Sequence, residues 1–154
     1  MPSFDVTSMA YVPNDAHWFL ANLIEEIQVQ GTKRSVVHIN YVIVEAASPE
    51  DAYKCAIKIG KEANQSYVNT RGKKVTVRFR GLNNLDVIHD PLEHGCEIMF
   101  REKLGLSEGA IRKLISSKHR LEVFTPIRRR PGKADYASKE IMDEVRSELS
   151  KRTR

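Results

Sequence analysis

The 154-residue sequence has little that would support catalysis, metal binding or membrane insertion. Its two cysteines, Cys55 and Cys96, stand in unrelated contexts, which excludes a disulfide framework and a CxxC metal pattern. The eight glycines form neither a GxGxxG nor a GxxxxGK loop. No apolar run approaches the roughly 20 residues of a membrane-spanning helix, and residues 1–14 hold no signal-peptide core. We expect a cytoplasmic protein without a cofactor.

Positive charge is concentrated near the C-terminus. Residues 1–117 carry 14 Lys and Arg against 14 Asp and Glu, whereas residues 118–154 carry 11 basic and 6 acidic residues. The formal net charge of +5 therefore belongs to the second stretch. Because such asymmetry often marks a contact segment, we expect three parts. They are an N-terminal arm at 1–16, a domain at 17–125, and a basic linker with an amphipathic helix at 126–154.

Two long strands are predicted near the N-terminus. Residues 17–29 are rich in aromatic and branched side chains, and residues 35–46 alternate between two faces. A turn containing Gly31 would join these strands in a hairpin. One face of the second strand carries four large apolar residues: Val37, Ile39, Tyr41 and Ile43.

A helix is predicted directly after these strands. Ser48 can cap free backbone N–H groups, Pro49 suits the first helical position, and two acidic residues follow at the positive end of the helix. Five small or apolar residues then recur at helical spacing: Ala52, Cys55, Ala56, Ile59 and Ala63. This stripe indicates a helix that lies across a sheet, with Cys55 as a core thiol.

Further strands and a second helix are predicted downstream. Residues 64–73 indicate a polar loop, and residues 74–80 alternate in a way that sends Val75, Val77 and Phe79 inward. The alternation over residues 96–101 favours another strand in a second hairpin, with a short helix as the alternative. Ser107 begins a helix, and residues 121–124 are expected to return as an edge strand.

The order of these elements indicates an α+β domain. Its antiparallel sheet would be covered on one face by helices, with a C-terminal helix appended. Ferredoxin-like and dimeric-barrel architectures are the expected relatives. The second sheet face would be buried by another subunit, buried by a ligand, or left open.

Parts of this pattern resemble a known family. The segment Trp18-Phe19-Leu20-Ala21-Asn22-Leu23-Ile24-Glu25-Glu26, the strand over residues 41–44, the helix start over residues 46–52 and residues 75–81 together are similar to a small bacterial family of unknown function. That family is catalogued as domain of unknown function four-two-eight-eight. The resemblance covers residues 17–125 and implies a compact α+β domain. It implies no catalytic residue.

Basic residues form one candidate site. Three of them project from one face of the strand over residues 74–80, and three lie in the linker. A sheet that binds nucleic acid usually adds exposed aromatic residues, whereas Phe79 points to the other face. The alternative interpretation is a solvated face balanced by Glu25, Glu26 or Glu97. The candidate phosphate contacts are Lys74, Arg78, Arg80, Arg128, Arg129 and Arg130.

Polar residues of the first hairpin form a second candidate site. A small pocket could gather Glu25, Glu26, His38 and Asn40, with His38 and a carboxylate as an acid–base couple. A hydrogen-bonded core histidine or a subunit-interface residue is the alternative. Residues 89–96 also crowd His, Asp, Glu and Cys around a turn, but their spacing matches no known metal site. We expect no metal.

The function expected from these observations is protein interaction. The C-terminal helix carries a narrow apolar stripe suited to a partner: Ala137, Ile141, Val145 and Leu149. We expect a non-enzymatic bacterial module that self-associates through its sheet as a homo-oligomer, with its tail on a protein partner. Nucleic-acid binding through the basic strand face and linker is the alternative. An enzyme using His38 with Glu25 or Glu26 is the third hypothesis.

Overall fold

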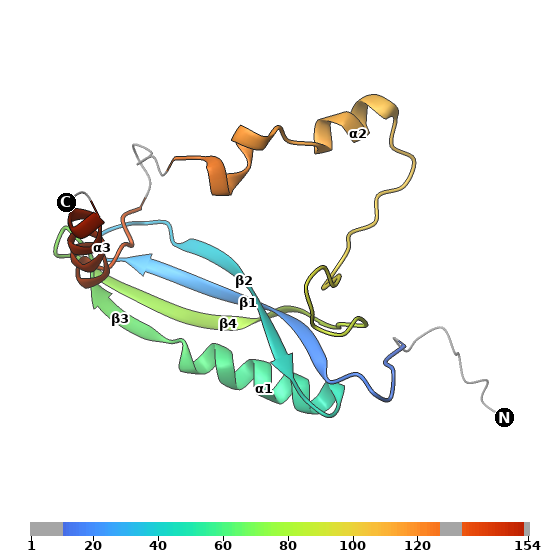
Figure 1. Ribbon diagram of the computed structural model, residues 1–154. Coiled ribbons are helices and arrows are strands. Elements are labelled where there is room, and N and C mark those ends of the chain that lie inside the picture. The colour runs from blue at the N-terminus through green and yellow to red at the C-terminus, as the bar shows by residue number, and fades with distance from the viewer. Residues whose placement is uncertain (1–10, 127–133, 153–154) are drawn as a thin grey trace. The chain divides into compact units, whose positions relative to one another are not determined.

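The computed structural model describes residues 11–126 and 134–152, which fall into two compact units (Figure 1). The described part of the first unit comprises residues 11–99 and 134–152, and that of the second comprises residues 100–126. The linker arginines Arg128, Arg129 and Arg130 lie outside the described residues, as do the first ten residues of the predicted N-terminal arm.

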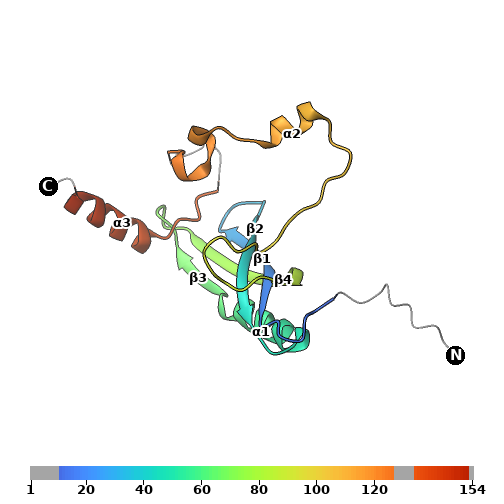
Figure 2. The same ribbon diagram turned by 45° about the vertical axis from the view of Figure 1, so that its right-hand side comes forward.

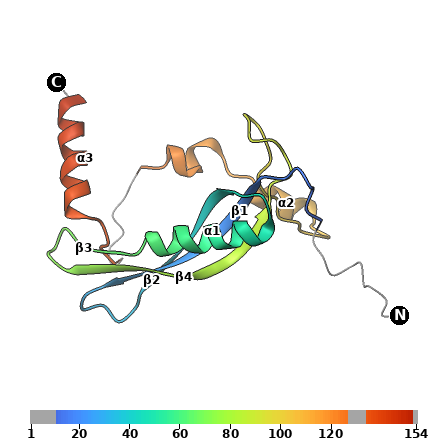
Figure 3. The same cartoon turned by 90° about the horizontal axis from the view of Figure 1, so that it is seen from below.

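The first unit contains a curled, antiparallel four-stranded sheet (Figures 1 and 3). Its strands are β1 (Trp18–Val29), β2 (Val36–Glu45), β3 (Gln65–Val68) and β4 (Lys74–Val87). They lie in the order β2-β1-β4-β3, so β2 and β3 form the two edges. The predicted hairpin of β1 and β2 is confirmed, with a regular register from Trp18 opposite Glu45 to Ile27 opposite Val36.

Helix α1 (Pro49–Glu62) covers one face of this sheet (Figure 3). It begins as predicted, because Ser48 Oγ accepts a hydrogen bond from Asp51 N at 3.1 Å and Pro49 occupies the first turn. Gly60 brings the helix close to the ring of Phe79. Cys55 is half-buried and packs against the core. The core between α1 and the sheet consists of Phe19, Ala21, Leu23, Val44, Ala52, Ala56 and Val87.

A second apolar cluster continues on the same face of β1. Ile27 and Val29 have the same parity as Leu23, so strand alternation places all three on the α1 face. They pack with Val75 and Val77 of β4, which confirms the predicted inward side of that strand. Partly buried residues from other segments close this cluster: Val36, Tyr67 and Ala134.

Three expectations about strands are wrong. Residues 96–101 form no strand, because β4 continues to Val87 and already fills the place beside β1. The predicted polar loop at 64–73 contains β3, which gains main-chain pairing from the outer edge of β4 despite its polar composition. Residues 121–124 close a local 3-10 turn, in which Phe124 N donates to Leu121 O at 2.9 Å.

The α+β class with an antiparallel sheet is confirmed. Two strands, one helix and two strands build the sheet. The ferredoxin-like assignment is not confirmed. Among the helices of the described residues, α1 makes the main contacts with the strands.

The second unit is built from short local elements. Helix α2 (Glu108–Leu114) starts at Ser107 as predicted, and Ser107 Oγ accepts a hydrogen bond from Ala110 N at 3.2 Å. Two 3-10 turns follow, η2 (Lys118–Arg120) and η3 (Glu122–Phe124). None of the residues described in this unit is buried. Its apolar side chains therefore form no core of their own.

Candidate interaction surfaces

The sheet face opposite α1 is here called the open face, although Leu20 and Asn22 of β1 are buried on it. It carries a row of exposed apolar side chains on β2. These are Val37, Ile39, Tyr41 and Ile43, which are 57%, 45%, 49% and 48% exposed. The alternate residues of β2 are less exposed, and Val44 on the α1 face is only 2% exposed. The prediction that the four residues share one face is therefore confirmed. They are called the β2 row below.

The β2 row stands on an edge of the sheet. Within the described part of the chain, β2 is paired with β1 alone, so its outer N–H and C=O groups face away from the sheet. Its ten residues include no Lys, Arg or Pro, which are common means of blocking an edge strand. The opposite edge, β3, has four residues and is followed by a bridge between Asn69 and Ser138. The two edges therefore differ in their capacity to pair with another chain.

The basic residues of β4 lie beside a carboxylate on the open face. Arg80 Nη1 is 2.9 Å and Arg78 Nη2 is 3.3 Å from Glu26 Oε1. Hydrogen bonds from Arg80, Ser35 and Arg78 hold the pKa of Glu26 below its ordinary value of 4.5, with Arg80 as the largest cause. Lys74 is exposed at the start of β4. The alternative interpretation of these basic residues is a solvated face balanced by a nearby glutamate. Glu26 supplies that balancing charge.

The four residues of the predicted polar pocket divide between two faces. Glu26 lies on the open face, whereas Glu25, His38 and Asn40 lie on the α1 face by register. Asn40 Nδ2 donates to Glu25 Oε2 at 2.5 Å. The His38 ring contacts Tyr136 edge to face, with ring centroids 5.3 Å apart. The structure therefore places His38 against an aromatic ring and pairs Glu25 with an amide.

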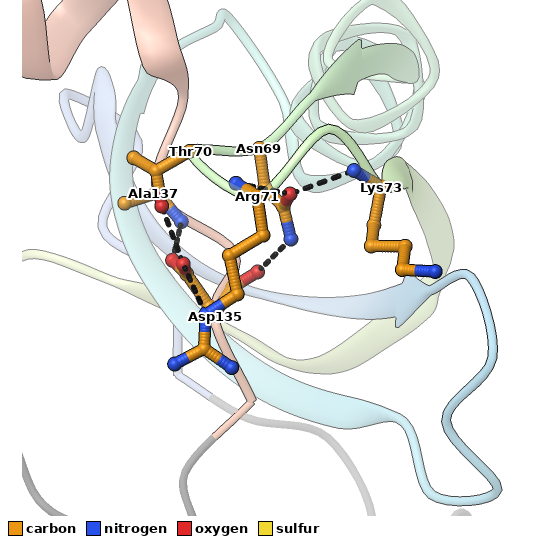
Figure 4. Close-up of polar contacts among 6 residues, drawn as sticks. All are labelled: Asn69, Thr70, Arg71, Lys73, Asp135 and Ala137. Atoms are coloured by element: carbon orange, nitrogen blue, oxygen red, sulfur yellow. Dashed lines mark hydrogen bonds and ion pairs between the residues drawn. The ribbon is translucent and has the colours of Figure 1, made fainter.

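A turn between β3 and β4 holds the segment that leads into the C-terminal helix (Figure 4). Asn69 is 1% exposed, and its Oδ1 accepts hydrogen bonds from Lys73 N at 2.8 Å and Arg71 N at 2.9 Å. Its Nδ2 donates to Asp135 O at 2.8 Å. A single buried amide therefore shapes the turn and binds the distant segment. Gly72, with φ of +76°, provides the left-handed residue that the turn requires.

Other contacts reinforce this attachment, here called the tail anchor. Thr70 Oγ1 donates to Asp135 Oδ2, and Arg71 Nε lies 3.7 Å from the same oxygen. The Tyr67 hydroxyl donates to Tyr136 O. Burial, with Tyr136 and Asp135 nearby, raises the pKa of Tyr67. Sequence reasoning missed the tail anchor, and the only local signal was the Asn-Thr-Arg-Gly turn composition.

Helix α3 (Lys139–Arg152) follows the tail anchor and begins beside the β3–β4 end of the sheet (Figure 2). The C-terminal helix is therefore confirmed. Of the predicted stripe, Ala137 precedes α3 and is half-buried in the anchored segment, where its N–H donates to Asp135 Oδ1 at 3.3 Å. The other three members are exposed on the helix: Ile141, Val145 and Leu149.

The crowded residues at 89–96 form a loop. Asp90 Oδ2 accepts a hydrogen bond from Glu97 N at 3.2 Å, which closes this loop on itself. In the part of the chain that the structure describes, no three His, Cys, Asp or Glu side chains converge as metal ligands. Over the same residues, no helix combines the length and apolar character needed to cross a bilayer.

Comparison with known families identifies the sheet domain. The family model described as Domain of unknown function (DUF4288) matches residues 18–100, which is more than half of the chain. The chain belongs to the DUF4288 family. The DUF4288 match contains β1 to β4 and α1, and it ends where the second unit begins. No curated protein and no solved structure matches the chain.

Proposed function

We propose that this DUF4288 protein is a non-enzymatic interaction module that self-associates through its sheet and presents α3 to a protein partner. The β2 row carries the proposal. Four large apolar side chains, each about half exposed, stand together on an edge strand that contains no Lys, Arg or Pro. Apolar patches and open edges of this kind mark protein contacts in soluble proteins.

The tail anchor supports the second part of the proposal. It fixes the residues directly before α3 to the sheet, while the helix itself has no buried residue. A helix of 14 residues with no buried side chain gains little stability from its own hydrogen bonds in water. A partner that covers Ile141, Val145 and Leu149 would stabilise α3 by burying this stripe.

Nucleic-acid binding is less well supported by the same face. Arg78 and Arg80 already share the Glu26 carboxylate, so a phosphate would have to compete with an ion pair. β4 itself also carries no exposed aromatic residue that could stack on bases. Self-association therefore explains the open face better.

Sedimentation velocity of the full chain over a range of concentrations tests self-association. Tyr41→Arg places a charge in the β2 row and should raise the dimer Kd at least about tenfold. The matched control is Tyr53→Arg, because Tyr53 lies on α1 and is 50% exposed, as against 49% for Tyr41. The control should dimerise like the parent. A parent chain that stays monomeric, or equal effects of both variants, would contradict the proposal.

Recovery of a partner from native extract tests the role of α3. Val145→Lys interrupts the exposed stripe and should abolish recovery by the tagged full chain. Ser147→Lys adds the same charge at an exposed position outside the stripe and should leave recovery unchanged. Equal recovery by all three proteins would remove α3 from the proposal.

A further inference from the structure

The two edges of the sheet are built differently, and only one is suited to pairing. β3 is short and lies next to the Asn69–Ser138 bridge, whereas β2 offers ten residues with a regular register against β1. The register shifts at Asn22/Leu23 and Ile24/Glu25 both fall in the pairing of β1 with β4, not in that of β1 with β2. An edge that is long, regular and free of blocking residues is a template for another strand. The sequence of β2 indicates which strand fits it.

We infer that two copies of the chain pair antiparallel along β2, with Asn40 opposite Asn40 of the second copy. The two four-stranded sheets then join into one sheet of eight strands. This inference rests on the proposed self-association and specifies its partner and geometry. A two-fold axis that relates adjacent antiparallel strands stands perpendicular to the sheet, so both open faces lie on the same side. Residues of equal parity then stand opposite each other.

The β2 row selects one register among those that symmetry allows. With Asn40 at the axis, Val37 lies opposite Ile43 of the second copy, and Ile39 lies opposite Tyr41. All four exposed residues of each copy thereby gain an apolar neighbour across the junction. Moving the axis to Ile39 sets Ile43 opposite Ser35, and moving it to Tyr41 sets Val37 opposite Glu45. Each shift leaves an apolar residue against a polar one.

Charge at the two ends of β2 agrees with this register. Lys33 and Arg34 precede the strand, and Glu45 ends it. Antiparallel pairing brings Glu45 of the second copy opposite Ser35 and diagonal to Lys33, which has the same parity. The overlap from Val36 to Val44 supplies about one main-chain hydrogen bond per residue, which approaches the total of about ten in a typical interface. Pairing along β2 is therefore self-complementary in shape, charge and hydrogen bonding.

Site-directed cross-linking of the full chain tests the register. Val37→Cys and Ile43→Cys are made separately after Cys55 and Cys96 have been replaced by Ala, and the variants are co-expressed with different tags. A short bifunctional thiol reagent should join the two variants to each other at least about tenfold more than either variant to itself. Identical positions lie six residues apart along the strands, about 20 Å. Val68→Cys is the control, because Val68 on β3 is 52% exposed and should join neither variant.

The outcomes separate this inference from the proposed function. Selective joining of the two different variants supports the register centred on Asn40. Joining of identical variants, or equal joining of the Val68→Cys control, overturns it. A dimer in sedimentation that gives no mixed cross-link overturns β2 pairing and leaves self-association standing. A parent chain that sediments as a monomer at every concentration overturns both.

Discussion

At the scale of single residues, Gly60 shows how closely α1 approaches the sheet. A Cβ at this position would lie 2.5 Å from two ring atoms of Phe79, a contact that side chains cannot make without displacement. Gly60→Ala gains about 0.5–1 kcal/mol in helix propensity, but overpacking costs about 1–3 kcal/mol. We therefore expect the substitution to lower the free energy of unfolding by about 1 kcal/mol in urea titrations.

Two further variants identify the cause of that loss. Gly109→Ala changes a helical glycine whose Cβ would have no atom within 4 Å, so it should not destabilise the chain. Phe79→Leu combined with Gly60→Ala should recover part of the lost stability, because the smaller side chain leaves room for the methyl group. A Gly60→Ala chain as stable as the parent would show that the helix moves away at little cost.

The side chain of Glu26 stabilises the folded chain in a pH-dependent way. Its pKa is held below 4.5 by hydrogen bonds from Arg80, Ser35 and Arg78, so its stabilising effect is complete above about pH 4.5. The effect is lost as pH falls through the lowered pKa. Glu26→Gln should therefore reduce the urea midpoint at pH 7 and have no further effect in strong acid. Glu50→Gln, at an exposed carboxylate of α1, should change the midpoint less at either pH.

At the scale of elements, the tail anchor is the attachment most open to test. Asn69 makes three hydrogen bonds from a buried position, so Asn69→Ala should lower the free energy of unfolding by about 2–3 kcal/mol. Hydrogen exchange should also accelerate in residues 134–138, which the amide holds. Asn83→Ala, at an exposed residue of β4, is the control and should change neither measurement. Unchanged exchange in Asn69→Ala would show that the other anchor contacts suffice.

The elements that could be predicted are those whose signal is local. Ser48 and Ser107 mark their helices through caps within a few residues, and the alternation of β2 assigns Ile39 and Tyr41 to one face without any knowledge of the fold. β3 was missed because its stability comes from pairing with β4, which composition does not record. Asn69 was missed for the same reason, since its partner Asp135 lies 66 residues away.

The candidate sites follow the same division. The prediction that the β4 arginines face away from the core needed only strand parity. Glu26 supplies the charge that the alternative interpretation, a solvated face balanced by Glu25, Glu26 or Glu97, requires. The proposed grouping of Glu25 with Glu26 failed because adjacent strand residues point to opposite faces. His38 contacts Tyr136 because the tail anchor brings together segments that are far apart in the chain. Sequence patterns within either segment do not record this contact.

At the scale of the whole molecule, the second unit differs from the first in having no buried residue among 100–126. Local unfolding there costs little, because few apolar contacts are lost. Chymotrypsin compares the units at matched side-chain exposure: Phe124 is 51% exposed, and Tyr41 and Tyr53 of the sheet unit are 49% and 50% exposed. At protein concentrations below the dimer Kd, we expect cleavage after Phe124 to be at least about tenfold faster than cleavage after either tyrosine, as followed by mass spectrometry.

The reason is that a protease needs an extended, unpaired backbone as well as an accessible side chain. Tyr41 is held by the β2 ladder and Tyr53 by α1, whereas Phe124 lies in a single 3-10 turn. Cleavage after either tyrosine requires partial unfolding of the sheet unit. The rate of this cleavage should therefore fall when the sheet unit is made more stable. Cleavage after Phe124 should not depend on the stability of the sheet, so Gly60→Ala should accelerate cleavage at the tyrosines alone. Similar initial rates at all three positions would contradict the division into a packed unit and an unpacked one.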